Sequence, residues 1–172
     1  MVACAVARAD TELAESYRDF ARAARDHVHV LLADDPDRDR AQIWFLGHWG
    51  WMYYAEEEGL AKLHSTGPFP KAGDVVIVPA FVDKGKVLER SPRVRARMRQ
   101  IDQVVVAGRV PIRTMHPVGA GFYAMFSRPR HRRPPPVPYR FGGEIPLEIF
   151  DLHRIQGRPG SGARISPLYG PE

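Results

Sequence analysis

The stretch from Ala41 to Gly59, AQIWFLG followed by HWGWMYYAEEEG, constrains the fold more than any other part of this chain. Its first seven residues are a short apolar run ending in glycine, which predicts a buried strand. We expect a helix from about Trp49 to Glu58, ended by Gly59 in a left-handed conformation. A strand that leads through a glycine into a helix is typical of α/β folds. The turn between them is therefore expected at the carboxyl edge of a sheet, where such folds most often bind ligands.

An amphipathic helix is predicted before this unit, from Asp10 to about Ala33, with Asp10 or Thr11 as its N-cap. Apolar residues recur there at three- and four-residue spacing, namely Leu13, Tyr17, Phe20, Ala24 and Val28. The apolar residues before Asp10 are expected to be the last turns of a longer segment. Proline after two aspartates, in ADDPDRDR, then predicts a solvated turn.

The remaining elements are predicted from shorter patterns. A turn is expected at Lys71 to Asp74, a strand at Val75 to Val78 ended by Pro79, and a surface segment or short helix at residues 84–99. Further strands are expected in DQVVVAG (102–108), in VPIRTM (110–115) and in IPLEIFDLHRI (145–155). The proline- and arginine-rich segment 127–143 is predicted to be irregular, and residues 157–172 are predicted to be disordered.

Together these elements predict a small layered α/β sandwich in a single domain, from residue 10 to residue 156. Its sheet is expected to be mixed and partly parallel, with four to five strands and two to three helices. The length of 172 residues is enough for one sizeable core.

Composition excludes several classes of site. The chain has one cysteine, Cys4, so an internal disulfide and a Cys-based metal site are excluded. The histidines show no H-x-x-x-H or H-E-x-x-H spacing, and no phosphate-loop or G-x-S-x-G motif is present. We therefore expect no metal and no cofactor. The net charge of +5 leans toward anionic partners without identifying one.

The strand–helix turn carries the candidate chemistry. Gly47 is expected to make the tight turn, and His48 to lie at the helix N-terminus, where it would donate to a phosphate or act as an acid or base. Trp49 and Tyr53 share one helix face, and Gly50 shares another with Tyr54. We expect one pair to pack on the sheet and the other to line a cleft, where aromatic faces suit sugars. An equally weighted alternative makes all these rings core or rim, with His48 in one hydrogen bond.

Charged residues elsewhere leave alternatives open. Residues 56–58 are three consecutive glutamates at a helix C-terminus, where negative charge is unfavourable. They either face nearby arginines or form a solvated charge run, which is the interpretation we prefer. The basic loop at residues 128–140 is a candidate contact for nucleic acid or anionic lipid headgroups.

An ordered set of motifs resembles a known family. GHWGWMYYAEEEG resembles the G-H-W-G-F-Q-Y-Y-M-E-x-x-G signature of bacterial membrane glycosyltransferases related to the dolichyl-phosphate-mannose protein mannosyltransferases. AGDVVIVP, VPIRTM, GAGFYAMF and the closing PYRF and IPLEIFDLHRI are similar to later segments of their C-terminal soluble extracytoplasmic domain. The order agrees from about residue 10 to residue 155. Trp51, Met52, Ala55 and Glu57 stand where the pattern has Phe, Gln, Met and often Lys.

The resemblance implies a domain without its own catalytic centre. In that family the acidic catalytic residue lies on a loop of the membrane-helix bundle, which this chain does not contain. Residues 1–9 are then expected to be the remnant of a preceding membrane helix. The expected ligand-binding residues are Gly47, His48, Trp49, Tyr53, Tyr54, Arg113 and Tyr123.

Three functions are therefore carried forward. The first is a non-catalytic accessory domain that positions an acceptor or a lipid-linked sugar headgroup, with the membrane helices of a parent or neighbouring protein as its partner. The second is a small enzyme that uses His48 as acid or base, with Arg113, on an anionic or sugar-phosphate substrate. The third is a basic module for nucleic acid, which we do not favour, or for anionic membranes. The expected location is the extracytoplasmic face of the membrane within a longer protein, or the cytoplasm for this chain alone, because it has no export signal.

Overall fold

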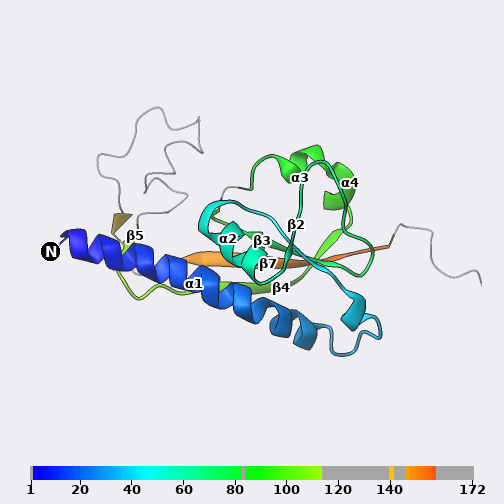
Figure 1. Ribbon diagram of the computed structural model, residues 1–172, viewed down its shortest axis with the longest axis horizontal. Helices are drawn as coiled ribbons and strands as arrows, with labels where there is room; N and C mark the ends of the chain where they lie inside the picture. The colour runs from blue at the N-terminus through cyan, green and yellow to red at the C-terminus, as the bar shows by residue number, and fades with distance from the viewer. Residues whose placement is uncertain (1, 83, 114–139, 142–145, 158–172) are drawn as a thin grey trace, which may run out of the picture.

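The computed structural model describes residues 2–82, 84–113, 140–141 and 146–157, which form a three-layer α/β fold (Figure 1). A five-stranded sheet lies between a long helix with its neighbour on one face and two single-turn helices on the other. In chain order the elements are α1 (Val2–Leu31), the 3-10 helix η1 (Arg38–Arg40), β1 (Ile43–Phe45), α2 (Trp49–Glu57), β2 (Ala61–Lys62), β3 (Val75–Pro79), α3 (Val87–Arg90), α4 (Pro92–Arg95), β4 (Met98–Val106), β5 (Ile112–Arg113), β6 (Arg140–Phe141) and β7 (Glu148–Ile155).

The sheet is mixed, as predicted. Its strand order is β2-β1-β3-β7-β4, with β1 parallel to β2 and to β3, and with β7 antiparallel to both β3 and β4. The carboxyl ends of β1, β2, β3 and β4 therefore lie at one edge, together with the amino end of β7. We call this the carboxyl edge. β5 and β6 form a separate two-stranded sheet.

The main core is an aromatic cluster between the sheet and the α1–α2 layer. Trp51 of α2 is fully buried there, with its ring centroid 4.8 Å from that of Phe150 on β7. Phe20 of α1 stacks on Phe150 at 4.0 Å. Phe45 of β1 meets Trp51 edge-on at 6.0 Å. α1, β1 and β7, which are far apart in sequence, thus meet around one indole. The apolar surface removed from water there is the main stabilising contribution to the fold.

A second, smaller core lies on the opposite face of the sheet. Trp44 and Leu46 from β1 and the residue after it, together with Val76 and Val78 of β3, pack there against α4 through Val94. Side chains of a strand alternate between the two faces of a sheet. Both faces of β1 and β3 are covered, which explains their continuous apolar sequences.

A buried carboxylate ties the amino ends of β1 and β3 together. Asp74 is 6% exposed and accepts hydrogen bonds from the Gln42 N–H at 3.1 Å, the Lys71 N–H at 2.8 Å and the Trp44 Nε1–H at 2.9 Å. The predicted turn at Lys71 to Asp74 is confirmed. The aspartate tolerates burial because three donors satisfy its oxygens.

The predicted start of the first helix is wrong. α1 begins at Val2, and Thr11 is an interior residue whose hydroxyl donates to the Ala7 carbonyl at 2.9 Å. Ala5, Val6 and Ala9 continue the apolar stripe and pack around Val110. The pattern therefore extends two turns beyond the expected cap. Among the described residues, none of the helices combines the length and the hydropathy that a membrane span needs.

Other boundaries differ in smaller ways. The strand expected at residues 102–108 begins at Met98, and β2 was not predicted because two residues carry no periodicity. Segment 84–99 forms both α3 and α4, so four α-helices are described where two to three were expected. Arg140 and Phe141 form β6 inside a segment predicted to be irregular. Residues 114–139 and the predicted disordered tail from residue 158 lie outside the described residues.

Replacing Asp74 tests the polar contact that joins β1 to β3. Asp74→Ala removes the acceptor of three donors, so we expect a loss of about 3 kcal/mol in the free energy of unfolding. Asp151→Ala is the matched control, because Asp151 accepts from the exposed amides of Gln100 and Gln103, and its replacement should cost under about 1 kcal/mol. Urea denaturation measures both, and equal losses would contradict this role of Asp74.

Candidate functional site at the carboxyl edge

The turn between β1 and α2 is built around a glycine that nothing larger can replace. Gly47 has φ of +113°, and a Cβ atom there would lie 2.9 Å from Trp51 Cδ1 and 3.0 Å from Val82 Cγ1. Both the backbone conformation and the space therefore demand glycine. The Trp51 indole also donates to the Leu46 carbonyl at 2.9 Å. The turn is thus held rigidly from beneath by the core.

This rigid turn carries His48 and Trp49 to the surface. His48 is the N-cap residue of α2, with extended backbone and no side-chain capping bond, and it is half-buried. A Cβ atom on Gly85 would lie 3.5 Å from its Nε2 atom, so the loop after β3 passes directly beside the imidazole. The expected position of His48 at the helix N-terminus is what the structure shows.

Trp49 has an unusual backbone conformation. Its φ is +63°, and it is the non-glycine residue with positive φ among the described residues. A left-handed conformation costs a bulky L-residue about 1–2 kcal/mol. The side chain is nevertheless 56% exposed, so core packing does not account for tryptophan at this position. Strain of this kind concentrates at functional sites.

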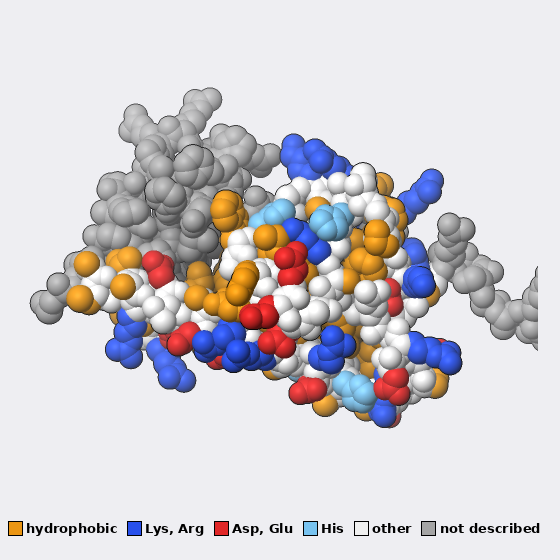
Figure 2. Space-filling model, viewed as in Figure 1, with side chains coloured by type: hydrophobic (Ala, Val, Ile, Leu, Met, Phe, Trp, Pro, Cys, Tyr) orange, Lys and Arg blue, Asp and Glu red, His pale blue; other side chains and the backbone are white. Residues whose placement is uncertain are grey.

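Tyr53 lies one turn further along the same face of α2 and is 62% exposed. Its ring meets Tyr54 edge-on at 5.2 Å, and Tyr54 in turn packs against the main core. Figure 2 shows hydrophobic, acidic and histidine side chains close together over α2. The buried positions of the helix are Trp51 and Ala55, so Trp49 and Tyr53 form an outward-facing aromatic pair.

The three glutamates at the end of α2 divide between the two expected roles. Glu58 forms an ion pair with Arg22 of α1, with 3.5 Å between Arg22 Nε and Glu58 Oε1. Glu56 and Glu57 are exposed. An acidic side chain therefore borders the aromatic pair, at its end away from His48.

Two expected site residues do not join this group. Arg113 is in β5, which belongs to the small second sheet and lies beside the N-terminal half of α1 (Figure 1). Tyr123 lies outside the described residues.

A buried carboxylate beneath the site was not predicted from the sequence. Glu148 at the start of β7 is fully buried and accepts from the Tyr17 hydroxyl at 3.0 Å, the Phe81 N–H at 2.8 Å and the Ile149 N–H at 3.0 Å. Burial raises the pKa of Glu148, and the donated hydrogen bonds only partly oppose this. Burial, and then the nearby Glu148 carboxylate, also raise the pKa of Tyr17.

A signal for Glu148 was present in the alternation of the last strand. Glu148, Phe150 and Leu152 occupy every second position, and all three are buried. The period of two therefore places the glutamate on the core-facing side with the two apolar residues. Its contacts join α1 to the loop after β3 at the carboxyl edge.

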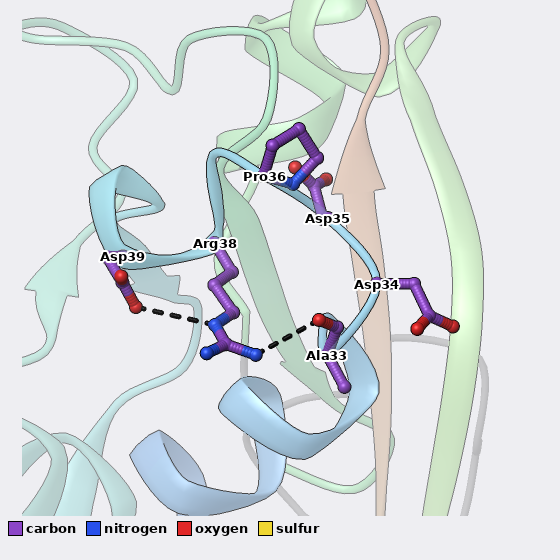
Figure 3. Close-up of a pocket in the computed structure, with 6 residues that line it drawn as sticks. All are labelled: Ala33, Asp34, Asp35, Pro36, Arg38 and Asp39. Atoms are coloured by element: carbon purple, nitrogen blue, oxygen red, sulfur yellow. Dashed lines mark hydrogen bonds and ion pairs between the residues drawn. The ribbon is translucent and has the colours of Figure 1, made fainter.

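A hollow elsewhere in the molecule does not belong to this site. It has a volume of about 310 Å³, is open to solvent, and lies where the chain passes from α1 toward the amino end of β1 (Figure 3). Arg38 is one of the residues that line it; it donates to the Ala33 carbonyl at 3.0 Å, and its Nε lies 3.6 Å from Asp39 Oδ1. The described residues contain no group of three or more potential metal ligands from His, Cys, Asp and Glu.

Comparisons of the chain with protein-family models, with curated proteins and with solved structures found no match.

Glu148 gives the fold a defined pH dependence. Because its pKa is raised in the folded protein, the folded state holds this proton more tightly than the unfolded chain does, and stability falls as pH rises through the folded pKa. Glu148→Gln keeps an acceptor for the two N–H groups and cannot ionise. We expect the variant's unfolding free energy, relative to the unmodified protein, to increase from about pH 4 upward.

Urea denaturation across pH 4–8 measures this difference, with exposed Glu89→Gln as the control that should show none. Glu148→Ala removes the acceptor altogether and should cost about 3 kcal/mol. A constant difference between the glutamine variant and the unmodified protein would show that Glu148 does not titrate as described.

Proposed function

We propose that this chain is a non-catalytic accessory domain of a membrane glycosyltransferase-like protein, and that the β1–α2 turn positions the sugar headgroup of a lipid-linked donor or an acceptor. The observation that carries the proposal is Trp49, a strained and exposed tryptophan on a turn held rigid by Gly47 and Trp51. Glycine at residue 49 would relieve the strain without affecting the core. The exposed part of the indole offers a flat apolar face to a ligand, at a position that the strained backbone fixes.

The chemistry of the surrounding surface supports a carbohydrate ligand. Sugar rings stack on exposed aromatic faces, and hydroxyl groups donate to carboxylates. Trp49 and Tyr53 supply two aromatic faces about 6 Å apart along the helix axis, and Glu57 lies one turn beyond Tyr53. His48 at the other end is a donor for a phosphate or hydroxyl oxygen.

The same geometry favours positioning over catalysis. Within the described residues, no hydrogen bond or ion pair joins His48 to an acid or a nucleophile, as a general acid–base centre requires. Glu148 is the buried carboxylate nearest in the fold, but its oxygens are bonded internally and it has no exposed surface. The alternative enzyme with Arg113 is disfavoured because Arg113 belongs to the other sheet.

The resemblance in sequence supplies the link to glycosyltransferases. Gly47 and Trp51, which stand in its first motif, have structural roles here, as does Asp74 in AGDVVIVP. Motif residues that stabilise a fold identify the type of domain, and they do not identify a reaction. This agrees with a domain that presents a ligand to a catalytic centre elsewhere.

Trp49→Gly separates ligand binding from folding. The free energy of unfolding should change by no more than about 1 kcal/mol, because glycine adopts positive φ without strain and this relief offsets the loss of the indole's own contacts. Affinity for a polyprenyl-phosphate-linked hexose in nanodiscs, measured by isothermal titration calorimetry, should fall about tenfold or more, since a lost stacking contact is worth about 1–3 kcal/mol.

Phe69→Gly is the matched control, because Phe69 is an exposed aromatic residue away from this turn. Its affinity should equal that of the unmodified protein. If Trp49→Gly and the unmodified protein bind with equal affinity, the aromatic site is excluded. If this chain alone transfers a hexose, and His48→Ala abolishes that activity, a non-catalytic domain is excluded.

A further inference from the structure

The outer layer formed by α3, α4 and the turn before β4 is strongly basic. Between residues 84 and 97 the chain has six lysines and arginines and a single acidic residue, Glu89. We call these six cations the basic layer: Lys84, Lys86, Arg90, Arg93, Arg95 and Arg97. Figure 2 shows Lys and Arg side chains along the margin of the molecule that α3 and α4 occupy in Figure 1.

The fold does not neutralise these charges. Among the described residues, ion pairs involve arginines of the α1 layer, of the turn after α1 and of β7, such as Arg22 with Glu58 and Arg154 with Asp35. No cation of the basic layer forms an ion pair there; Arg97 donates to the Gln156 carbonyl at 2.8 Å. Among the described residues, these arginine ion pairs thus lie outside the α3–α4 layer, and segment 84–97 itself has Glu89 as its acidic residue.

The helices that carry these cations are packed on the sheet through buried apolar residues. Val94 of α4 is 6% exposed, and Val87 and Leu88 of α3 pack beside it against the second core. Arg90, Arg93 and Arg95 are all exposed. Buried apolar side chains therefore hold α3 and α4 on the sheet, while the charged side chains point to solvent.

Nucleic acids and anionic membranes both carry the negative charge to bind such a surface, and the geometry favours a membrane. Sheet-based RNA binding needs an open strand face with aromatic residues, but here α3 and α4 cover that face. Groove readers insert a recognition helix, and these helices have four residues each. A broad array of cations without a groove or a reading element suits the diffuse charge of a lipid surface.

We propose that the basic layer docks the domain on an anionic phospholipid surface. The layer is continuous with the β1–α2 turn, because Gly85, between Lys84 and Lys86, lies against His48. Docking would hold the carboxyl edge at the level of the headgroups. The surface uses different residues from the aromatic site, so it stands or falls independently of the proposed function.

Vesicle co-sedimentation tests the docking surface. The full chain should bind phosphatidylcholine vesicles that contain about 30% phosphatidylglycerol, and binding should weaken strongly between about 0.1 M and about 0.5 M salt. The triple variant Arg90→Gln, Arg93→Gln, Arg95→Gln should bind these vesicles at least about tenfold more weakly. Each cation near the membrane surface contributes independently to the binding free energy.

The matched control is Arg8→Gln, Arg22→Gln, Arg25→Gln in α1, which reduces the formal charge equally, from +5 to +2 (5 − 3). It should keep binding within about twofold of the unmodified protein. Circular dichroism and thermal melting verify that both variants fold. Equal losses in the two variants, no binding to anionic vesicles, or salt-sensitive binding to nucleic acid but not to vesicles would each overturn the proposal.

Discussion

The fold and its candidate site both depend on the close approach of Gly47 to Trp51. The indole fills the centre of the core, in ring contact with α1, β1 and β7. It reaches that place because residue 47 has no side chain, and its N–H group then bonds back to the Leu46 carbonyl. The same packing directs α2 across the sheet and leaves His48 and Trp49 outside. A core constraint thus determines what the surface presents.

Two buried carboxylates hold the opposite ends of the sheet. Asp74 joins β1 to β3 at their amino ends, and Glu148 joins α1 to the loop after β3 at the carboxyl edge. Each accepts three hydrogen bonds from the protein itself, so neither is available to a ligand. Asp74 and Glu148 therefore have structural roles in the interior of the protein. The surface of the described residues presents the rings of Trp49 and Tyr53 and the cations of the basic layer.

The sequence predicted contiguous features well and long-range features poorly. The strand, glycine turn and helix from Ile43 to Gly59 follow from adjacent residues, and Gly59 has the expected left-handed φ of +72°. The start of α1 was missed because a short polar residue at Thr11 is compatible with both a cap and a helix interior. Glu148 was not predicted because a glutamate is rarely buried and no neighbouring residue signals its partners. Arg113 could not be placed, since the second sheet depends on pairing between segments far apart in the chain.

The close approach at Gly47 is tested most directly by comparing alanine at two glycines. Gly47 and Gly67 both have positive φ, +113° and +128°, but only at Gly47 would a Cβ atom meet other atoms within 4 Å. Alanine at either position suffers backbone strain, and at Gly47 it also displaces Trp51. The free energy of unfolding of Gly47→Ala should therefore fall at least about 2 kcal/mol further than that of Gly67→Ala. Equal losses in urea denaturation would contradict the account, because backbone conformation alone would then explain the glycine.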